Sequence, residues 1–297
     1  MTIEMPHSTG IFAVWLSRVP RAWMRCVLSC ATLCTTPSLT AHAMEAPAPG
    51  EISVPSAGAP ETLIRKLADA FNAKRGTALV TVPPGIGPES AIDAVLSGKA
   101  ALAGLGRTLT AAEKNRGLRE WVIAREAVVF ATGAGAGVEN LSSRQLALIF
   151  SGGMRDWARA GGPPAPIRVL YREESELLLQ IIRRTMPAFT ALRFSGDGKI
   201  VIRDHQMIDL MLKFKYAAGW GSLSNIRAAA TLRVPALDGI VPGAKTLASG
   251  RYPLWYDATL VYRQAPTGVS RDFVDFVFSD AGRKIIDALD ALPRARE

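Results

Sequence analysis

Cysteine and histidine are scarce in this chain of 297 residues, and their scarcity removes most metal and nucleophile chemistry. The three cysteines, Cys26, Cys30 and Cys34, lie near the N-terminus, and only His205 occurs after residue 43. A histidine-based zinc site would need further ligands, and a Ser-His-Asp triad could use only His205. The chain also contains no P-loop and no G-x-S-x-G motif. We therefore predict a protein that is not an enzyme and that carries no metal or cofactor.

One enzymatic alternative stays open on the residues alone. Glu173 and Glu174 are adjacent carboxylates, and His205 is the single imidazole of the chain after residue 43. Carboxylates and imidazoles are the usual general acids and bases of hydrolases. A hydrolase that uses one of these glutamates with His205 is the alternative to a binding protein.

Long hydrophobic runs are missing as well, and the one moderately apolar stretch, residues 26–34, lies near the N-terminus. Two arginines precede this stretch, and a small-x-small sequence ending at Ala43 follows it. This order is typical of a secretory signal, and the stretch is too short to span a bilayer. We expect residues 1–43 to be a signal peptide cleaved after Ala43, which predicts a periplasmic protein. A true start at Met24 and lipidation at Cys30 are the alternatives.

Acidic residues are in the minority, with 26 Asp and Glu against 35 Lys and Arg and a formal net charge of +9. Removal of residues 1–43 leaves +7, so the mature protein is still basic. A basic surface attracts nucleic acid, anionic lipid or anionic solutes. No Lys/Arg block and no basic stripe interleaved with aromatic residues supports nucleic-acid binding. The composition predicts either a solvated basic surface or a small anionic ligand, and no nucleic acid.

Segments with strand and helix patterns alternate along the chain. Apolar residues from Leu63 to Phe71 share one helical face that ends at Gly76, and Gly87-Pro88 starts another helix. Capping boxes at 110–113 and 142–145 start two more. The remaining predicted helices are 173–186, 205–214 and a closing pair broken at Ser279, and the predicted strands are 51–54, 79–82, 100–103, 127–131, 167–171, 217–220 and 259–262. This alternation predicts an α/β fold with a mostly parallel sheet.

Three turns that lead from a strand into a helix have the composition of an anion site. They cover residues 55–62, 83–90 and 171–175. In open α/β sheets, ligands bind beyond the carboxyl ends of the strands, where helix N-termini offer free amides and a positive dipole end. If these turns face one cleft, they predict a binding site for a small anion.

Two arginines follow predicted strands, Arg107 and Arg172. Arginine is suited to bidentate contact with an oxyanion, which makes both side chains candidate ligand contacts. The alternative is that each arginine pairs with a nearby acid such as Glu113 or Glu173. Spacing alone does not separate these two hypotheses.

Several segments taken together resemble the phosphate-binding protein family of ABC transporters. They are Leu141-Ser-Ser-Arg-Gln-Leu146, Ile149-Phe-Ser-Gly152 with Trp157, Pro166-Ile-Arg-Val169, the stretch 96–110 with Glu113, Ser249-Gly-Arg-Tyr-Pro-Leu254 and Phe276-Val-Phe-Ser279. The resemblance covers about residues 51–293. It implies a two-lobed periplasmic-binding-protein fold of type II, in which two α/β lobes are joined by two hinge strands.

The resemblance also implies a division of the chain and a role for it. Lobe I would comprise residues 51–129 plus 261–297, and lobe II residues 130–260. The hinge strands would be 127–131 and 259–262. The protein would be an exported, monomeric solute-binding protein that captures phosphate or a related oxyanion between its lobes for an ABC transporter permease.

The family's ligand-binding turns match this chain only in part. The positions carried over as ligand-binding are Thr62, Gly87, Ser90, Arg107, Arg172 and Ser175. The family's arginine turn continues to Ser-Gly-Thr, whereas Glu176 and Leu177 follow Ser175 here. Carboxylates beside a bound anion cost free energy unless they are neutralised. The alternative function is therefore a ligand-degenerate periplasmic interaction or sensing module that keeps the fold without tight phosphate binding.

Overall fold

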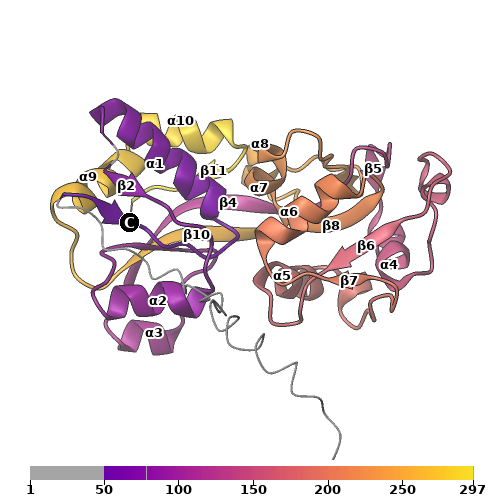
Figure 1. The fold of residues 1–297 in the computed structure, drawn as a ribbon, viewed down its shortest axis with the longest axis horizontal. Helices are drawn as coiled ribbons and strands as arrows, with labels where there is room; N and C mark the ends of the chain where they lie inside the picture. The colour runs from indigo at the N-terminus through magenta and orange to yellow at the C-terminus, as the bar shows by residue number, and fades with distance from the viewer. Residues whose placement is uncertain (1–49, 78, 297) are drawn as a thin grey trace, which may run out of the picture. The chain divides into compact units, whose positions relative to one another are not determined.

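Helices and strands alternate through the computed structural model, which describes residues 50–77 and 79–296 (Figure 1). In chain order the helices are α1 (Glu61–Arg75), α2 (Pro88–Leu96), α3 (Ala111–Asn115), α4 (Ser143–Ser151), α5 (Leu177–Thr185), α6 (Asp204–Lys213), α7 (Leu223–Ala228), α8 (Ala244–Ala248), α9 (Gly268–Val277) and α10 (Asp280–Ala288). Two 3-10 helices are η2 (Trp157–Ala160) and η3 (Pro187–Phe189). The strands are β1 (Ile52–Ser53), β2 (Val80–Thr81), β3 (Ala103–Leu105), β4 (Arg119–Thr132), β5 (Asn140–Leu141), β6 (Arg168–Tyr171), β7 (Lys199–Ile200), β8 (Ala217–Ser222), β9 (Ala236–Leu237), β10 (Trp255–Tyr262) and β11 (Leu292–Pro293).

The predicted signal peptide, its cleavage site after Ala43 and the alternatives at Met24 and Cys30 lie outside the described residues. Within the described part of the chain, none of the helices combines the length and the apolar character needed to cross a membrane.

The largest sheet has the strand order β3-β10-β4-β8-β6-β7, and β11 also pairs with β4. The long strand β4 pairs with β10 over residues 119–127 and with β8 over residues 128–132, both antiparallel. Only β8-β6 and β6-β7 are parallel in this sheet. The α/β class is confirmed. The prediction of a mostly parallel sheet is wrong for its centre, because β4 and β10 run in opposite directions.

The strands β4 and β10 connect two groups of helices. In Figure 1, α1, α2, α3, α9 and α10 surround one end of these strands, and α4, α5 and α6 surround the other end. Residues 119–127 of β4 lie on the side of β3 and β10, and residues 128–132 continue toward β8. The lobe boundaries near residues 130 and 260 remain a prediction.

Local sequence signals predicted the following helix ends correctly. Thr110 and Ser142 each form a reciprocal capping box at the start of α3 and α4. Gly87 precedes Pro88 at the start of α2, and Ser279 caps α10. Gly76 ends α1 in the left-handed region at φ 74°, a conformation that glycine adopts without a steric penalty.

Four predicted elements are wrong in their limits. The strand predicted at 259–262 begins already at Trp255, because residues 255–258 also pair with β4. The strand predicted at 100–103 is β3, which begins at Ala103, because the Ala100 amide still bonds back to Ala94 at the end of α2. The helix predicted from 173 begins only at Leu177, because the Glu176 side chain caps its first amides. The strand predicted at 127–131 extends back to residue 119, because those residues pair with β10.

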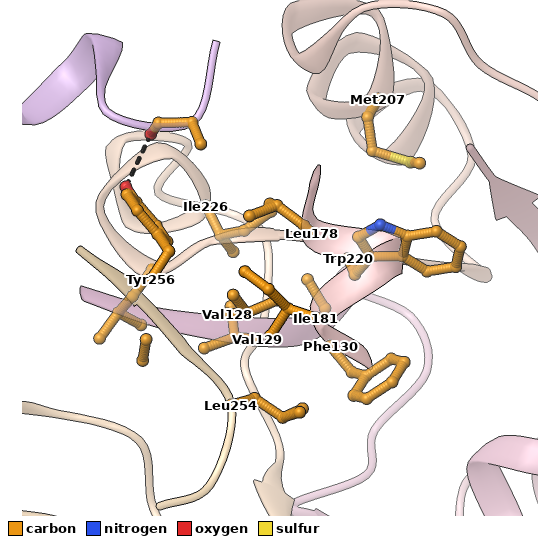
Figure 2. Packing of buried hydrophobic residues seen from close by; sticks show 14 of the residues in the cluster. Val128, Val129, Phe130, Leu178, Ile181, Met207, Trp220, Ile226, Leu254 and Tyr256 are labelled. Atoms are coloured by element: carbon orange, nitrogen blue, oxygen red, sulfur yellow. Dashed lines mark hydrogen bonds between the residues drawn. The ribbon is translucent and has the colours of Figure 1, made fainter. Parts of the chain in front are cut away.

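Large side chains bury the point where β4 passes between the helix groups. Figure 2 shows Val128, Val129 and Phe130 of β4 close to Leu178 of α5 and Trp220 of β8. All five are at most 4% exposed. Full burial of a side chain of this size stabilises a fold by roughly 1.5–3 kcal/mol. The crossing strands are therefore part of the main hydrophobic core.

A buried carboxyl group links the two crossing strands. Glu126 of β4 is fully buried, and its Oε1 accepts from the Ser224 amide at 2.6 Å. The Tyr256 hydroxyl of β10 lies 2.6 Å from Glu126 Oε2 and 3.0 Å from the Ala59 carbonyl oxygen. One hydroxyl proton cannot serve both acceptors. A protonated Glu126 that donates to Tyr256 satisfies both contacts, and burial raises the pKa of Glu126 accordingly.

We predict that Glu126→Gln makes the protein more stable than the wild type, by an amount that grows with pH. The raised pKa means that the folded state holds this proton more tightly than the unfolded state. Stability therefore falls as pH rises above the ordinary carboxyl value of 4.5. A glutamine amide donates to Tyr256 in the same way and cannot lose a proton. Urea unfolding at pH 4, 6 and 8 measures the difference, with Glu139→Gln, an exposed position, as the control. A difference that does not change with pH contradicts the prediction.

Candidate functional site

Gly58, in the turn between β1 and α1, is approached by side chains from α6 and α7. The Asn225 side-chain amide, in α7, donates to the Gly58 carbonyl oxygen at 3.1 Å. The Asp204 carboxylate, in α6, lies so close that a Cβ atom at position 58 would be 1.8 Å from its Oδ2. A side chain at position 58 would therefore have to displace this carboxylate.

The first two of the predicted anion-binding turns lie against each other. The Gly85 amide donates to Glu61 Oε2 at 2.7 Å, and the Ile86 amide donates to the Ser56 carbonyl oxygen at 2.9 Å. Residues 55–61 and 85–87 therefore form one surface beside the N-terminus of α1.

Arg172, directly after β6, is the buried cation of this region. Its side chain is 9% exposed, its Nη1 lies 3.2 Å from Asp204 Oδ1, and its Nη2 donates to the Ile202 carbonyl oxygen at 2.9 Å. The Nε atom has no hydrogen-bond partner among the described residues. The acid partner of Arg172 is thus Asp204, and the suggested pairing with Glu173 is not formed.

Glu176 and Leu177, at the start of α5, also belong to this region. The Glu176 carboxylate accepts from the Leu178 and Leu179 amides at 2.9 and 2.8 Å. Burial raises the pKa of Glu176 and nearby Asp204 raises it further, while Arg172 lowers it. The Leu177 side chain lies 2.9 Å from the place that a Cβ of Gly106 would take. Residues after β6 and after β3 are therefore in contact.

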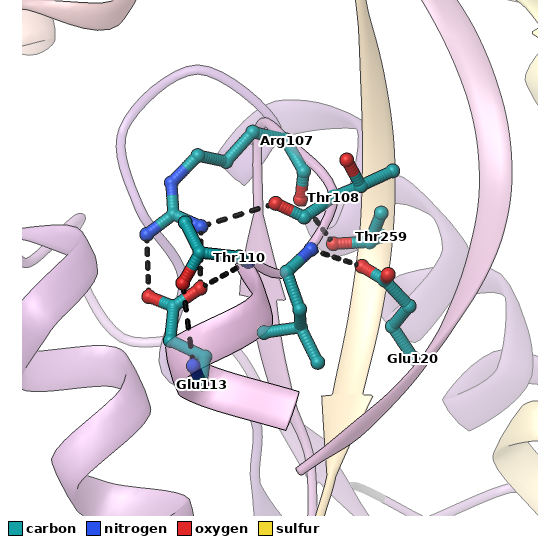
Figure 3. A network of polar contacts seen from close by, with 7 residues as sticks. Arg107, Thr108, Thr110, Glu113, Glu120 and Thr259 are labelled. Atoms are coloured by element: carbon teal, nitrogen blue, oxygen red, sulfur yellow. Dashed lines mark hydrogen bonds and ion pairs between the residues drawn. The ribbon is translucent and has the colours of Figure 1, made fainter. Parts of the chain in front are cut away.

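Arg107 is held by an acid of its own neighbourhood, as the ion-pair hypothesis predicted. Figure 3 shows its guanidinium in bidentate contact with Glu113 of α3, at 2.8 and 2.7 Å. The Thr110 amide adds a third donor to this carboxylate at 2.7 Å. The hydrogen bonds from Arg107 lower the pKa of Glu113 to about 2, against the effect of its partial burial. The pKa of Arg107 is raised by the same hydrogen bond.

In the described part of the chain, the other predicted ligand residues make no hydrogen bond to Arg172. Thr62 is half-buried in the first turn of α1, and Gly87 and Ser90 are exposed at the start of α2. Ser175 is exposed, and its carbonyl oxygen accepts from Gln180 at 3.3 Å. Their assignment as ligand contacts stays a prediction.

The residues that sequence reasoning missed are the ones that come from distant segments. Asp204, Glu176 and Asn225 were not among the predicted contacts, although each lies at or next to the first turn of a helix. An acid at a helix start is a common capping signal, which gave no reason to expect Asp204 beside Arg172.

Neither a metal cluster nor the hydrolase arrangement is formed by the described residues. No three His, Cys, Asp or Glu side chains of residues 50–77 and 79–296 lie so as to hold a metal ion. His205 is exposed on α6, and no hydrogen bond in the described part of the chain joins it to either glutamate. Glu174 is instead bonded by Arg183 at 2.7 Å.

Comparison with known proteins identifies the fold as the two-lobed α/β fold of periplasmic binding proteins. The phosphate ABC transporter substrate-binding protein from Clostridium perfringens, described as putative and solved with bound phosphate, aligns with a TM-score of 0.67 at 22% identity. The alignment covers 82% of this chain and 99% of that one. A family model described as a PBP superfamily domain matches residues 41–281. The chain belongs to the PBP superfamily.

Two curated relatives carry the same name, phosphate-binding protein PstS. The protein of Borreliella burgdorferi is 26% identical over 192 residues, which cover 61% of this chain and 68% of the relative. The protein of Bacillus subtilis is 23% identical over 251 residues, which cover 82% of this chain and 80% of the relative.

We predict that Glu113→Gln lowers the free energy of unfolding by about 1–2 kcal/mol at pH 7, because it removes the charged partner of Arg107. The lowered pKa means that this stabilisation is complete above about pH 5 and disappears as pH falls toward about 2. Urea unfolding at pH 7 and pH 3 measures the difference between variant and wild type.

Asp93→Asn is the matched control for this prediction. Asp93 pairs with Arg116 at 3.7 Å in a more exposed setting, where ion pairs contribute little. Equal losses for the two variants, or a loss at Glu113 that is as large at pH 3 as at pH 7, would contradict the prediction.

Proposed function

We propose that this chain is an exported solute-binding protein that captures phosphate or a related oxyanion for an ABC transporter permease. It would work in the periplasm, as a monomer, by binding rather than by catalysis. The observation that carries the proposal is the buried guanidinium of Arg172, whose Nε has no acceptor among the described residues. A buried donor without a partner costs about 1–3 kcal/mol, and a ligand oxygen would satisfy it.

The surroundings of Arg172 support an oxyanion rather than another ligand. The first turns of α1, α5 and α6 lie around the guanidinium and Gly58, and helix N-termini favour negative charge. The relatives named phosphate-binding protein PstS support phosphate as the first candidate. Thr62 and Ser175 are the hydroxyls that we propose as further ligand contacts. Gly87, Ser90 and Arg107 are the remaining residues that we propose for this site.

The proposed capture takes place between two lobes, with residues 51–129 plus 261–297 on one side and 130–260 on the other. Hinge motion at β4 and β10 would open and close the site. The contacts at Gly58 support this division, because Asp204 and Asn225 come from one predicted lobe and Gly58 from the other.

A second candidate function is supported by a specific observation. Asp204 and Glu176 already engage Arg172 and the first amides of α5. These contacts favour, as the alternative, an interaction or sensing module that keeps the fold without tight phosphate binding. Titration with phosphate separates the two functions.

We predict that phosphate binds the purified protein and that Arg172→Gln weakens the binding by about 30- to 150-fold, or 2–3 kcal/mol. Isothermal titration calorimetry measures both affinities. Arg168→Gln is the matched control, because Arg168 lies on β6, the strand that Arg172 directly follows, is exposed and stacks on Phe214. Thermal melting shows whether each variant is folded.

Two results would contradict this proposal in different ways. The absence of heat with phosphate, sulfate and molybdate would end the oxyanion hypothesis and leave the interaction module. Phosphate binding that Arg172→Gln leaves unchanged would remove Arg172 from the site.

A further inference from the structure

The carboxylate of Asp204 lies where the proposed function requires a ligand anion. One oxygen, Oδ1, is 3.2 Å from Arg172 Nη1. The other oxygen, Oδ2, is directed at the backbone of Gly58, in the turn between β1 and α1. The carboxylate thus bridges the buried cation and the first helix-starting turn, which are the two features that would otherwise receive an oxyanion.

Glu176 occupies a second anion-binding feature of the same region. The first amides of a helix lack partners within the helix and are available to an anion. In α5, which has nine residues, the Leu178 and Leu179 amides both donate to the Glu176 carboxylate. Trp220 Nε1 contacts the same carboxylate at 3.4 Å.

In this arrangement the charge of Arg172 is neutralised, but its hydrogen-bond donors do not all have acceptors. Arg172 is one cation, and both Asp204 and Glu176 interact electrostatically with it or with each other. Its Nε nevertheless has no acceptor among the described residues. The internal carboxylates therefore neutralise the guanidinium but leave one of its donors without an acceptor. A ligand with more oxygens could satisfy that donor as well.

We propose that Asp204 is an internal competitor of the ligand, which holds Arg172 until an external oxyanion displaces it, and that Glu176 plays the same part at the N-terminus of α5. This inference rests on the proposed function and concerns the affinity of the same site. The free energy of phosphate binding is then the difference between the interaction of Arg172 with phosphate and its interaction with Asp204. Removal of the internal charge raises this affinity.

A purely structural role for Asp204 makes the opposite prediction. Removal of one partner from a buried ion pair leaves the other charge uncompensated, which destabilises the protein. If Asp204 is purely structural, the variant protein is less stable and binds phosphate no more tightly than the wild type. If Asp204 is an internal competitor, the free variant is also less stable, but it binds phosphate more tightly.

The test is calorimetric titration of the protein with phosphate, for the wild type and for Asp204→Asn. Asparagine keeps the shape and one acceptor oxygen but removes the charge. We expect Asp204→Asn to bind phosphate at least tenfold more tightly than the wild type. Asp209→Asn is the matched control, because Asp209 is exposed on the same helix, and its affinity is expected to be unchanged.

Glu176→Gln provides a second, independent variant in case Asp204→Asn does not fold. Glutamine keeps one acceptor for the α5 amides and removes the charge, so its phosphate affinity is also expected to rise. Glu173→Gln, an exposed position three residues earlier, is its control. Thermal melting with and without phosphate identifies a folded variant and gives a second measure of binding.

The outcomes separate this inference from the proposed function. Phosphate binding to the wild type that Asp204→Asn and Glu176→Gln leave equal or weaker overturns the competitor and leaves the binding function intact. No binding to the wild type or to either folded variant overturns both. Binding to a variant alone, or binding at least tenfold tighter than to the wild type, is the expected result.

Discussion

The arrangement of the site depends on one buried positive charge, the guanidinium of Arg172. A buried guanidinium without a counter-charge costs several kcal/mol, so the fold has to bring an anion to it. Asp204 supplies that anion from the start of α6, and the parallel pairing of β6 with β7 brings the two segments together. A side chain at Gly58 would have to displace the same carboxylate. The ion pair therefore restricts the residue at a turn that is distant in sequence.

The contacts at that turn differ in how easily they could be separated. The Ala59 carbonyl oxygen is bonded by Tyr256 of β10, deep in the core that the crossing strands share. Asn225 reaches the neighbouring Gly58 through one hydrogen bond, and the Asp204 carboxylate lies close to it. The proposed hinge motion about β4 and β10 would have to separate these contacts and the contact of Leu177 with Gly106. The turn is thus fixed to the crossing strands and only lightly held by α6 and α7.

The sequence predicted what is locally encoded and missed what is brought together from a distance. The capping boxes at Thr110 and Ser142 and the glycine stop at Gly76 are encoded within a few residues, and all were correct. Half of β4 was missed because its residues 119–126 are charged and polar as well as apolar, and only pairing with β10 makes them a strand.

The candidate site shows the same contrast between contacts that are encoded locally and contacts between distant segments. The pairing of Arg107 with Glu113 was predicted as one of two hypotheses, because the two residues are six positions apart. The pairing of Arg172 with Asp204 was not, because Glu173 and Glu174 offered nearer acids in sequence. Glu176 was recognised as a departure from the resembled family, but its role as a helix cap follows only from the amides that it accepts.

Arg172 has more hydrogen-bond donors than the chain supplies acceptors for, and this excess affects which anions can bind. An internal carboxylate is held close to the guanidinium by the chain itself, so a free anion meets a competitor of high effective concentration. A carboxylate from solution offers two acceptor oxygens, the same number as Asp204. A tetrahedral oxyanion has more acceptor oxygens, and one of them could accept from the Arg172 Nε that Asp204 leaves without a partner. If Asp204 is the competitor that we propose, the exchange favours a ligand that satisfies more of the arginine's donors than the chain does.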